Sequence, residues 1–307
     1  MTSPSPRIGT GPAATTAPRP VRTADIVLTA VAPAIWGSTY ITTTELLPHG
    51  YPMTVAMLRA LPAGLLLLAI VRTLPFGIWW IRSLILGAVN FSIFWSFLFL
   101  SAYRLPGGVA ATVGAVQPLI VIGLAHVLLG RKARPATILA TLAGLGGIAL
   151  LVLTPAARLD GLGIIAGLAG AVSMACGTVL TRRWQPPVSA LTFTAWQLTA
   201  GGLLLLPVAL VLEPPLPALT ETNIAGFVWL GLIGGAFAQL LWFRGIARLE
   251  PAIVASLGFL SPVTAVTLGW ILLGQSLTLP QIAAILIVMG SIWYVQHVER
   301  KALAKSR

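Results

Sequence analysis

Charged residues are scarce in this sequence: they make up 8% of its 307 residues, and only seven of them are acidic. A water-soluble domain carries about 25% charged residues, so most of this surface must face something other than water. The net charge of +12 could suggest nucleic acid. However, the cations stand singly or in twos and threes between apolar runs and form no basic motif. We therefore expect a membrane protein that contacts the lipid bilayer and binds no nucleic acid.

Cysteine is nearly missing, and so are the motifs of several enzyme classes. The one cysteine, Cys176, lies inside an apolar run and has no partner for an intramolecular disulfide. No G-x-x-x-x-G-K-S/T stretch occurs, so we expect no ATP to drive transport through this chain. The motifs H-E-x-x-H and G-x-S-x-G do not occur either. An enzyme is thus disfavoured, and we expect no cofactor and no metal site.

Long apolar runs dominate what the sequence does contain, and turn signals and charges divide them into ten segments. Each is long enough to cross a hydrocarbon core of about 30 Å as a helix. Helices are expected because backbone groups in lipid must be satisfied within the segment. The sequence predicts an all-α polytopic membrane protein with spans near 24–46, 51–71, 81–102, 107–129, 136–153, 162–181, 191–212, 224–243, 251–273 and 280–296.

The distribution of cations orients these spans, because cytoplasmic loops carry an excess of Lys and Arg. With a cytoplasmic N-terminus, every one of the 19 cations falls on the cytoplasmic side except Arg59, Arg104 and Arg158. Residues 1–23 are then expected to be a disordered cytoplasmic tail, with a short organellar transit sequence as the alternative. Residues 299–307 form a basic cytoplasmic tail. We expect the membrane to be the bacterial inner membrane.

Two stretches of the chain, 144 residues apart, are similar in sequence. RLPGGVAATVGAVQP at 104–118 matches RLEPAIVASLGFLSP at 248–262, and over 27 positions nine residues agree, Pro118 and Pro262 among them. This repeat predicts two five-helix halves, 24–154 and 161–298. An odd number of spans per half inverts the second copy, which is the usual basis of alternating access in secondary transporters. The alternative is a chance likeness between helices rich in Leu, Ala and Gly.

Several short motifs occur in the same order as in a known family. They are W-G-S at Trp36–Ser38, an arginine in the second span (Arg59), an aromatic third span, A-x(6)-P from Ala111 to Pro118, and L-L-G at Leu128–Gly130. This order resembles the EamA module. Two such modules resemble the drug/metabolite transporter superfamily, in the amino-acid and metabolite exporter branch that includes aromatic amino acid exporters. The second half departs from the pattern, with A-C-G at Ala175–Gly177, and Arg131 and Gln275 replace the usual acid after each L-L-G position.

Polar side chains deep in a membrane are expensive and need a partner or a water-filled cavity. Gln239 is one such side chain, and the sequence repeat places Trp95 at the equivalent position of the first half. The position of Trp36 in the family motif implies that it faces inward. Arg59 could attract a substrate carboxylate, although snorkelling or bonding to carbonyls is the alternative. For the amides and hydroxyls the alternative is interhelical hydrogen bonding. The predicted substrate cavity comprises Trp36, Tyr40, Arg59, Asn90, Trp95, Gln117, Gln239 and Ser261.

Pro118 and Pro262 fall near the middle of the fourth and ninth expected spans. A proline inside a helix removes one hydrogen bond and kinks the helix. We expect these two kinks to act as hinges or gates on opposite sides of the cavity. The alternative is a static kink that only shapes the bundle.

The acids all fall at span ends or in loops, so no intramembrane carboxylate is available as a proton relay. His126 is the only histidine within an expected span, and a structural hydrogen bond is its favoured role. We expect a monomeric exporter of amino acids, aromatic and other uncharged ones included, with broad specificity. The alternatives are an exporter of drugs or other small metabolites and a nucleotide- or sugar-type antiporter, which the lack of deep cations other than Arg59 disfavours.

A topology experiment tests this orientation. Reporter fusions that are active on only one side of the membrane should place both termini in the cytoplasm, because ten spans return the chain to the side on which it began. A C-terminus on the opposite side would imply an odd number of spans and would contradict the two-half organisation.

Overall fold

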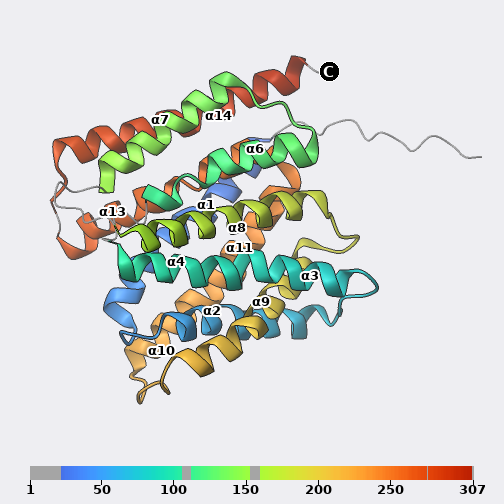
Figure 1. Cartoon of the computed structure of the whole chain (residues 1–307), viewed down its shortest axis with the longest axis vertical. Coiled ribbons are helices and arrows are strands. Elements are labelled where there is room, and N and C mark those ends of the chain that lie inside the picture. The colour runs from blue at the N-terminus through green and yellow to red at the C-terminus, as the bar shows by residue number, and fades with distance from the viewer. Residues whose placement is uncertain (1–21, 106–111, 153–159, 275, 306–307) are drawn as a thin grey trace, which may run out of the picture.

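The computed structural model describes residues 22–105, 112–152, 160–274 and 276–305, and all regular structure within them is helical (Figure 1). The expected disordered tail therefore lies outside the described residues up to position 21. The elements are α1 Thr23–Leu46, α2 Pro52–Val71, α3 Trp79–Gly87, η1 Ala88–Ser92, α4 Ile93–Arg104, α6 Gln117–Leu129, α7 Pro135–Val152, α8 Gly161–Arg183, α9 Ala190–Leu212, α10 Glu221–Val228, η2 Trp229–Phe237, α11 Ala238–Arg248, α12 Pro251–Leu257, α13 Leu260–Leu273 and α14 Leu279–Lys305.

Within the described residues, ten helices or helix runs are long and apolar enough to cross a membrane, which confirms the expected all-α polytopic fold. Two of them extend well past their expected cytoplasmic ends. The eighth runs over Glu221–Arg248 and the tenth over Leu279–Lys305, so residues 299–305 continue the last helix. The sequence prediction ended these spans too early because it took the polar residues that follow, Arg244 and His297, as boundaries.

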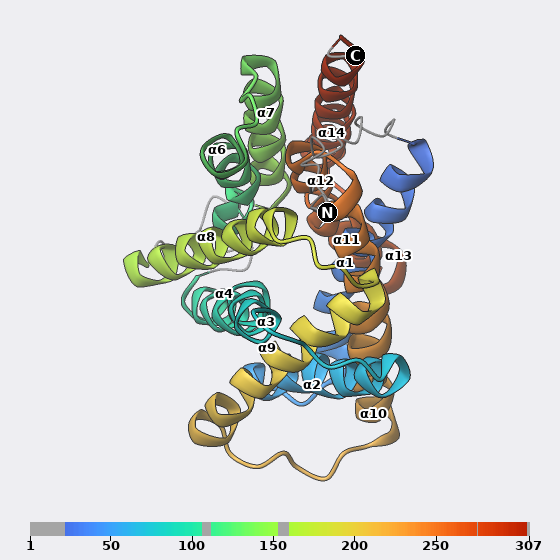
Figure 2. The same ribbon diagram turned by 90° about the vertical axis from the view of Figure 1, so that its right-hand side faces the viewer.

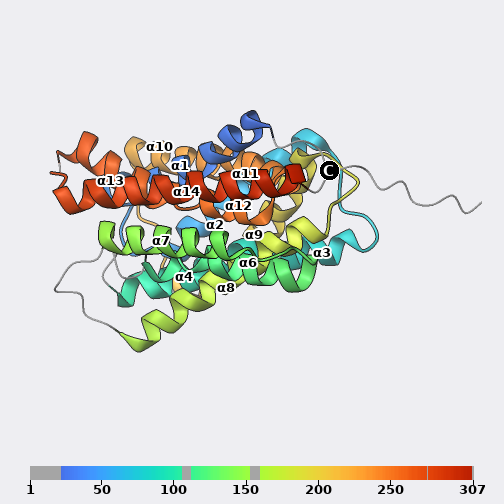
Figure 3. The ribbon, with the colours of Figure 1, turned by 90° about the horizontal axis from the view of Figure 1, so that it is seen from above.

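The helices pack mainly between the two halves of the chain. α2 lies along α9, α7 along α14, α1 against α11 and α13, and α8 against α4 and α6 (Figures 2 and 3). Glycine allows the closest of these approaches, as small residues do in membrane interfaces generally. A Cβ atom added to Gly202 on α9 would lie 2.6 Å from the backbone nitrogen of Leu61 on α2.

The third span of each half contains a π-helical segment, η1 in the first half and η2 in the second. The 144-residue offset of the sequence repeat places Ala88–Ser92 on residues 232–236, which lie inside η2. π-Helical turns are rare and occur frequently at functional sites. Both segments were missed at the sequence level, because their residues also suit an ordinary apolar helix.

Pro118 and Pro262 do not lie inside continuous helices, so the expectation of mid-helix kinks was wrong. Each of the two spans is instead divided into two helices by a short turn just before the proline. Pro118 lies in the first turn of α6, after a turn at 115–116. Pro262 lies in the first turn of α13, after a turn at 258–259, where the Ser261 N–H donates to the Gly258 carbonyl at 3.1 Å. A proline is tolerated in the first turn because its missing N–H has no partner there in any case.

The close contact at Gly202 makes a stability prediction. Gly202→Ala forces a methyl group onto the Leu61 backbone, and overpacking of this kind costs about 1–3 kcal/mol. The thermal unfolding midpoint in detergent should therefore fall. Gly146→Ala on α7 is the control, because an added Cβ there meets nothing within 4 Å. Equal midpoints for the two variants would contradict the packing.

Candidate functional site

A buried arginine lies between helices of the two halves of the chain. Arg59 on α2 is 9% exposed, and its Nη2 donates to the carbonyl oxygen of Gly234 in η2 at 3.2 Å. Trp36 on α1 donates its indole Nε1–H to the same oxygen at 3.0 Å. A carbonyl oxygen has two lone pairs and can serve both donors. Thus α1 and α2 of the first half both bond to the π segment of the second half.

Aromatic rings pack on and near this arginine. The guanidinium lies over the Trp95 ring, 5.2 Å from its centroid, a distance typical of a cation–π interaction. The Trp36 ring packs against Trp242 on α11 with centroids 5.1 Å apart, and Phe91 packs against Trp95 at 5.2 Å. Trp36, Arg59 and Trp95 of the predicted cavity are therefore brought together.

The structure adds Trp242, which sequence reasoning missed, to this central cluster. It is 1% exposed, and within the described residues its Nε1–H has no hydrogen-bond partner. Gln239 lies one turn earlier on the same helix, 5% exposed, and its Oε1 is likewise unpartnered in the described part of the chain. The i, i+3 spacing from Gln239 was the available sequence signal, because residues three apart share a helix face.

Asn90 lies elsewhere, between α8 and α9. Its Nδ2 donates to Gln197 Oε1 at 2.8 Å and to Thr181 Oγ1 at 3.3 Å, so it makes the interhelical hydrogen bonds that were its alternative role. Ser173 on α8 donates to the Val89 carbonyl at 2.8 Å. The π segment η1 is therefore bonded to α8 and α9 as η2 is bonded to α1 and α2.

The remaining predicted residues lie near the two helix breaks. The side-chain amide of Gln117 faces Gly258 in the turn between α12 and α13, and its Nε2 has no partner among the described residues. The backbone carbonyl of Ser261 lies against Gly37, the residue after Trp36, where an added Cβ would come within 2.6 Å. The side chain of Tyr40 lies outside the described part of the structure.

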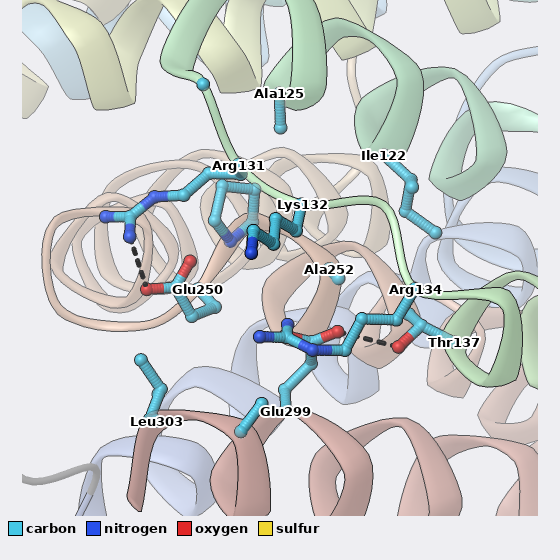
Figure 4. A pocket seen from close by; sticks show the side chains of 13 residues that line it. Ile122, Ala125, Arg131, Lys132, Arg134, Thr137, Glu250, Ala252, Glu299 and Leu303 are labelled. Atoms are coloured by element: carbon cyan, nitrogen blue, oxygen red, sulfur yellow. Dashed lines mark hydrogen bonds and ion pairs between the residues drawn. The ribbon is translucent and has the colours of Figure 1, made fainter. Parts of the chain in front are cut away.

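A cavity of about 210 Å³ opens at the end of the bundle that carries most of the cations (Figure 4). Two ion pairs line it: Arg131 lies 3.4 Å from Glu250, and Arg134 lies 2.5 Å from Glu299. Thr137 also donates to Glu299, at 2.6 Å. Both pairs join the loop before α7 to the second half, and neither was identified from the sequence.

Further polar contacts tie helix ends at this side of the molecule. Asp25, at the start of α1, lies 2.6 Å from Arg244 and 3.2 Å from Arg248 of α11. His126 Nδ1 lies 2.8 Å from the Arg131 carbonyl oxygen. A carbonyl can only accept, so Nδ1 carries the proton and His126 has the structural role expected of it.

At the opposite end of the bundle, an acidic side chain caps a helix. The carboxylate of Glu213 accepts hydrogen bonds from the backbone N–H groups of Met53 and Thr54, at 2.6 and 2.7 Å. These are orphan donors at the start of α2, where a negative charge also suits the helix dipole. The α2 helix that carries Arg59 is thereby fixed at its start by the second half of the chain.

The chain resembles known transporters over nearly its whole length. The EamA-like transporter family matches it twice, over residues 24–153 and 161–296. Protein PecM of Dickeya dadantii (strain 3937) is 42% identical over 269 residues, which cover 87% of this chain and 90% of PecM. The uncharacterized inner membrane transporter YedA of Escherichia coli (strain K12) is 30% identical over 254 residues, covering 80% and 81%.

Two weaker likenesses extend the comparison. A probable amino-acid metabolite efflux pump of Salmonella typhimurium (strain LT2) is 24% identical over 277 residues, which cover 84% of this chain and 90% of that protein. One solved crystal structure superposes with a TM-score of 0.78 at 19% identity, covering 92% of this chain and 99% of that one, which shows the fold alone. The two family matches and the PecM likeness carry the assignment: this chain belongs to the EamA-like transporter family and is a multi-pass membrane transporter, not an enzyme.

Proposed function

We propose that this transporter exports amino acids, aromatic and other uncharged ones included, through the central cluster around Arg59. The buried guanidinium carries the proposal, because it is a positive charge at membrane depth with aromatic rings beside it. A substrate carboxylate would replace the Gly234 carbonyl on Nη2, and the side chain would pack against Trp36, Trp95 and Trp242. Charge-assisted bonds of this kind are roughly twice as strong as neutral ones. The name of the Salmonella relative agrees with this substrate class.

Alternating access would come from two halves that are inverted copies. The mirrored contacts support this reading: η2 is bonded to Arg59 and Trp36, and η1 to Gln197 and Ser173. The sequence repeat sets Arg59 opposite Gln197 and Asn90 opposite Gly234. Breaking the contacts of η2 while those of η1 stay formed would open one side of the cavity, and the reverse would open the other side.

The breaks at Pro118 and Pro262 suit the role of hinges in this exchange. A hinge is a short segment at the end of an element that absorbs a change in backbone dihedrals. Each proline follows a two-residue turn in the fourth span of its half. The second of these turns lies beside Gln117, and the carbonyl of Ser261 lies against Gly37 of α1. Movement there would be transmitted directly to the helix that carries Trp36.

The membrane that we propose is the bacterial inner membrane, with both termini in the cytoplasm and the protein acting as a monomer. The name of YedA, an inner membrane transporter, supports the location. The cations gathered at the end of the bundle that holds Arg131 and Arg134 support the orientation.

Transport of a panel of substrates tests the function. Purified protein in liposomes should exchange labelled phenylalanine, tryptophan and leucine faster than glutamate, lysine or a nucleotide sugar. Arg59→Gln should lower the uptake rate at least tenfold, because a hydrogen bond to a charged group contributes about 1.5–3 kcal/mol. Glutamine already occupies the equivalent position, Gln197, so the substitution fits a helix at this depth.

Arg104→Gln is the matched control for this experiment. It removes the same charge from an exposed ion pair with Asp160, 3.8 Å long, and exposed pairs contribute little. Its uptake should equal that of the parent. Unchanged amino-acid uptake by a folded Arg59→Gln protein would refute the carboxylate role. Preferential uptake of nucleotide sugars or cationic drugs would instead favour the alternative substrates.

We also propose that transport has no obligatory coupling to protons. Proton coupling needs a group that changes its charge within the membrane, usually Asp, Glu or His. Six of the seven acids lie at helix ends, and Glu299 lies within the last two turns of α14. The acids at the end of the bundle with most cations are already paired: Asp25 with two arginines, Glu250 with Arg131 and Glu299 with Arg134. His126 bonds to a backbone carbonyl.

A pH gradient tests the absence of proton coupling. Proteoliposomes with equal substrate on both sides and a clamped membrane potential should accumulate no labelled phenylalanine when the pH gradient is imposed. Sustained accumulation would overturn the proposal. Its loss in His126→Ala would then identify the proton-carrying group, whereas its loss in Asp25→Asn would assign the role to the carboxylate at the start of α1.

A further inference from the structure

The last helix is longer than a membrane requires. α14 has 27 residues and spans about 40 Å at 1.5 Å per residue. The hydrocarbon core is about 30 Å thick, so about two turns of α14 extend into the headgroup region. Charged residues of α14 are confined to its last two turns, Glu299–Lys305, which places the protruding turns at the C-terminal end of the helix.

A stripe of four side chains marks the protruding end. Trp293, His297, Lys301 and Lys305 follow one another at intervals of four residues, so they lie on one face of α14. Trp293 is 63% exposed and stacks on His297 with ring centroids 5.3 Å apart and planes at 18°. Toward the C-terminus, the stripe therefore consists of two aromatic rings followed by two lysines. The same order is typical of a membrane–water interface, where aromatic rings lie at the headgroups and lysines extend to the phosphates.

The stripe borders a hollow between α14 and the start of α7. This pocket of about 380 Å³ is lined by Arg134, Tyr294, His297, Val298, Lys301, Ala302 and Lys305. Arg134 is anchored there by its 2.5 Å ion pair with Glu299. Among the described residues no acidic side chain pairs with Lys301 or Lys305, both of which are exposed. The pocket therefore has an unbalanced positive charge.

The neighbouring surface of the same two helices is apolar and suits acyl chains. Leu139 on α7 is 66% exposed, and Leu286 on α14 is 68% exposed. Figure 2 places α7 and α14 together at one edge of the bundle, away from α2 and α9. A ligand that carries a negative head at the pocket and long apolar tails along these helices would match both surfaces.

We propose that this pocket binds the headgroup of an anionic phospholipid of the cytoplasmic leaflet. Lys301 and Lys305 would bind the phosphate oxygens, while Trp293 and His297 would pack on the glycerol region. Anionic lipids give that leaflet its negative surface potential, which attracts basic segments at the ends of transmembrane helices. The bound lipid would fasten the α7–α14 pair at one face of the membrane, independently of the substrate.

Lipid binding to the full-length protein tests this site. The protein in uncharged detergent is titrated with phosphatidylglycerol or with phosphatidylcholine of the same chains, and bound lipid is counted by native mass spectrometry. Phosphatidylglycerol should bind more tightly. The double variant Lys301→Gln/Lys305→Gln should bind it about thirtyfold more weakly, because each basic residue near an anionic surface contributes about fivefold.

A second double variant that removes the same charge distinguishes a specific lipid site from general attraction between the basic end of the protein and anionic lipid. Lys132→Gln/Arg300→Gln removes two cations at the same end of the bundle but none that lines the pocket. It should retain the affinity of the parent for phosphatidylglycerol. An equal loss in both double variants, or an unchanged preference in Lys301→Gln/Lys305→Gln, would overturn the proposal.

Inorganic phosphate provides the last arm of the test, because a free anion offers the same oxygens as a lipid headgroup. Millimolar phosphate should leave the thermal unfolding midpoint unchanged, while phosphatidylglycerol raises it in the parent and not in Lys301→Gln/Lys305→Gln. A rise with phosphate alone that depends on the two lysines would make this a site for a soluble anion and overturn the lipid assignment.

Discussion

Hydrocarbon offers no hydrogen bonds, so each polar atom at membrane depth must find its partner within the protein. Arg59 and Trp36 meet this demand together by sharing the Gly234 carbonyl, and Asn90 meets it through Gln197 and Thr181. The same constraint makes every span a helix and keeps the acids out of the middle of the spans. Among the described residues, the buried Oε1 of Gln239 and Nε1 of Trp242 have no partner, so in the function that we propose they would be free to bond to the substrate.

The spans could be predicted from the sequence because 18 or more apolar residues have few structural solutions. Their ends could not, because ion pairs such as Arg244 with Asp25 allow a helix to continue past its apolar run. A rule that reads charge as a boundary cannot see a partner 219 residues away. The break before Pro262 escaped prediction for a similar reason, since proline alone does not distinguish a kinked helix from a new one.

The candidate site was predicted in part, and the difference follows from chemistry. Arg59 was selected because a cation is conspicuous in an apolar run, and Trp36 because of its position in the family motif; the structure brings the two together at one carbonyl. Asn90 was grouped with them on polarity, although its amide bonds to a neighbouring helix pair. The π segments carry no special composition: η2 reads WLGLIGGAF, which is equally suited to an ordinary helix. Only the packing of the other half shows that their carbonyls matter.

The helices pack mainly between the two halves of the chain. Most packing partners of the first five spans are therefore synthesised only after those spans. The acceptor of the Arg59 guanidinium, Gly234, lies 175 residues further along the chain. At 5–20 residues per second a ribosome needs roughly 10–35 s to reach it. During that interval the newly inserted half has neither its packing partners nor the carbonyl that accepts a hydrogen bond from Arg59. Biosynthesis of this protein therefore requires that the unfinished first half be protected until the second half is inserted. The complete protein needs no such protection.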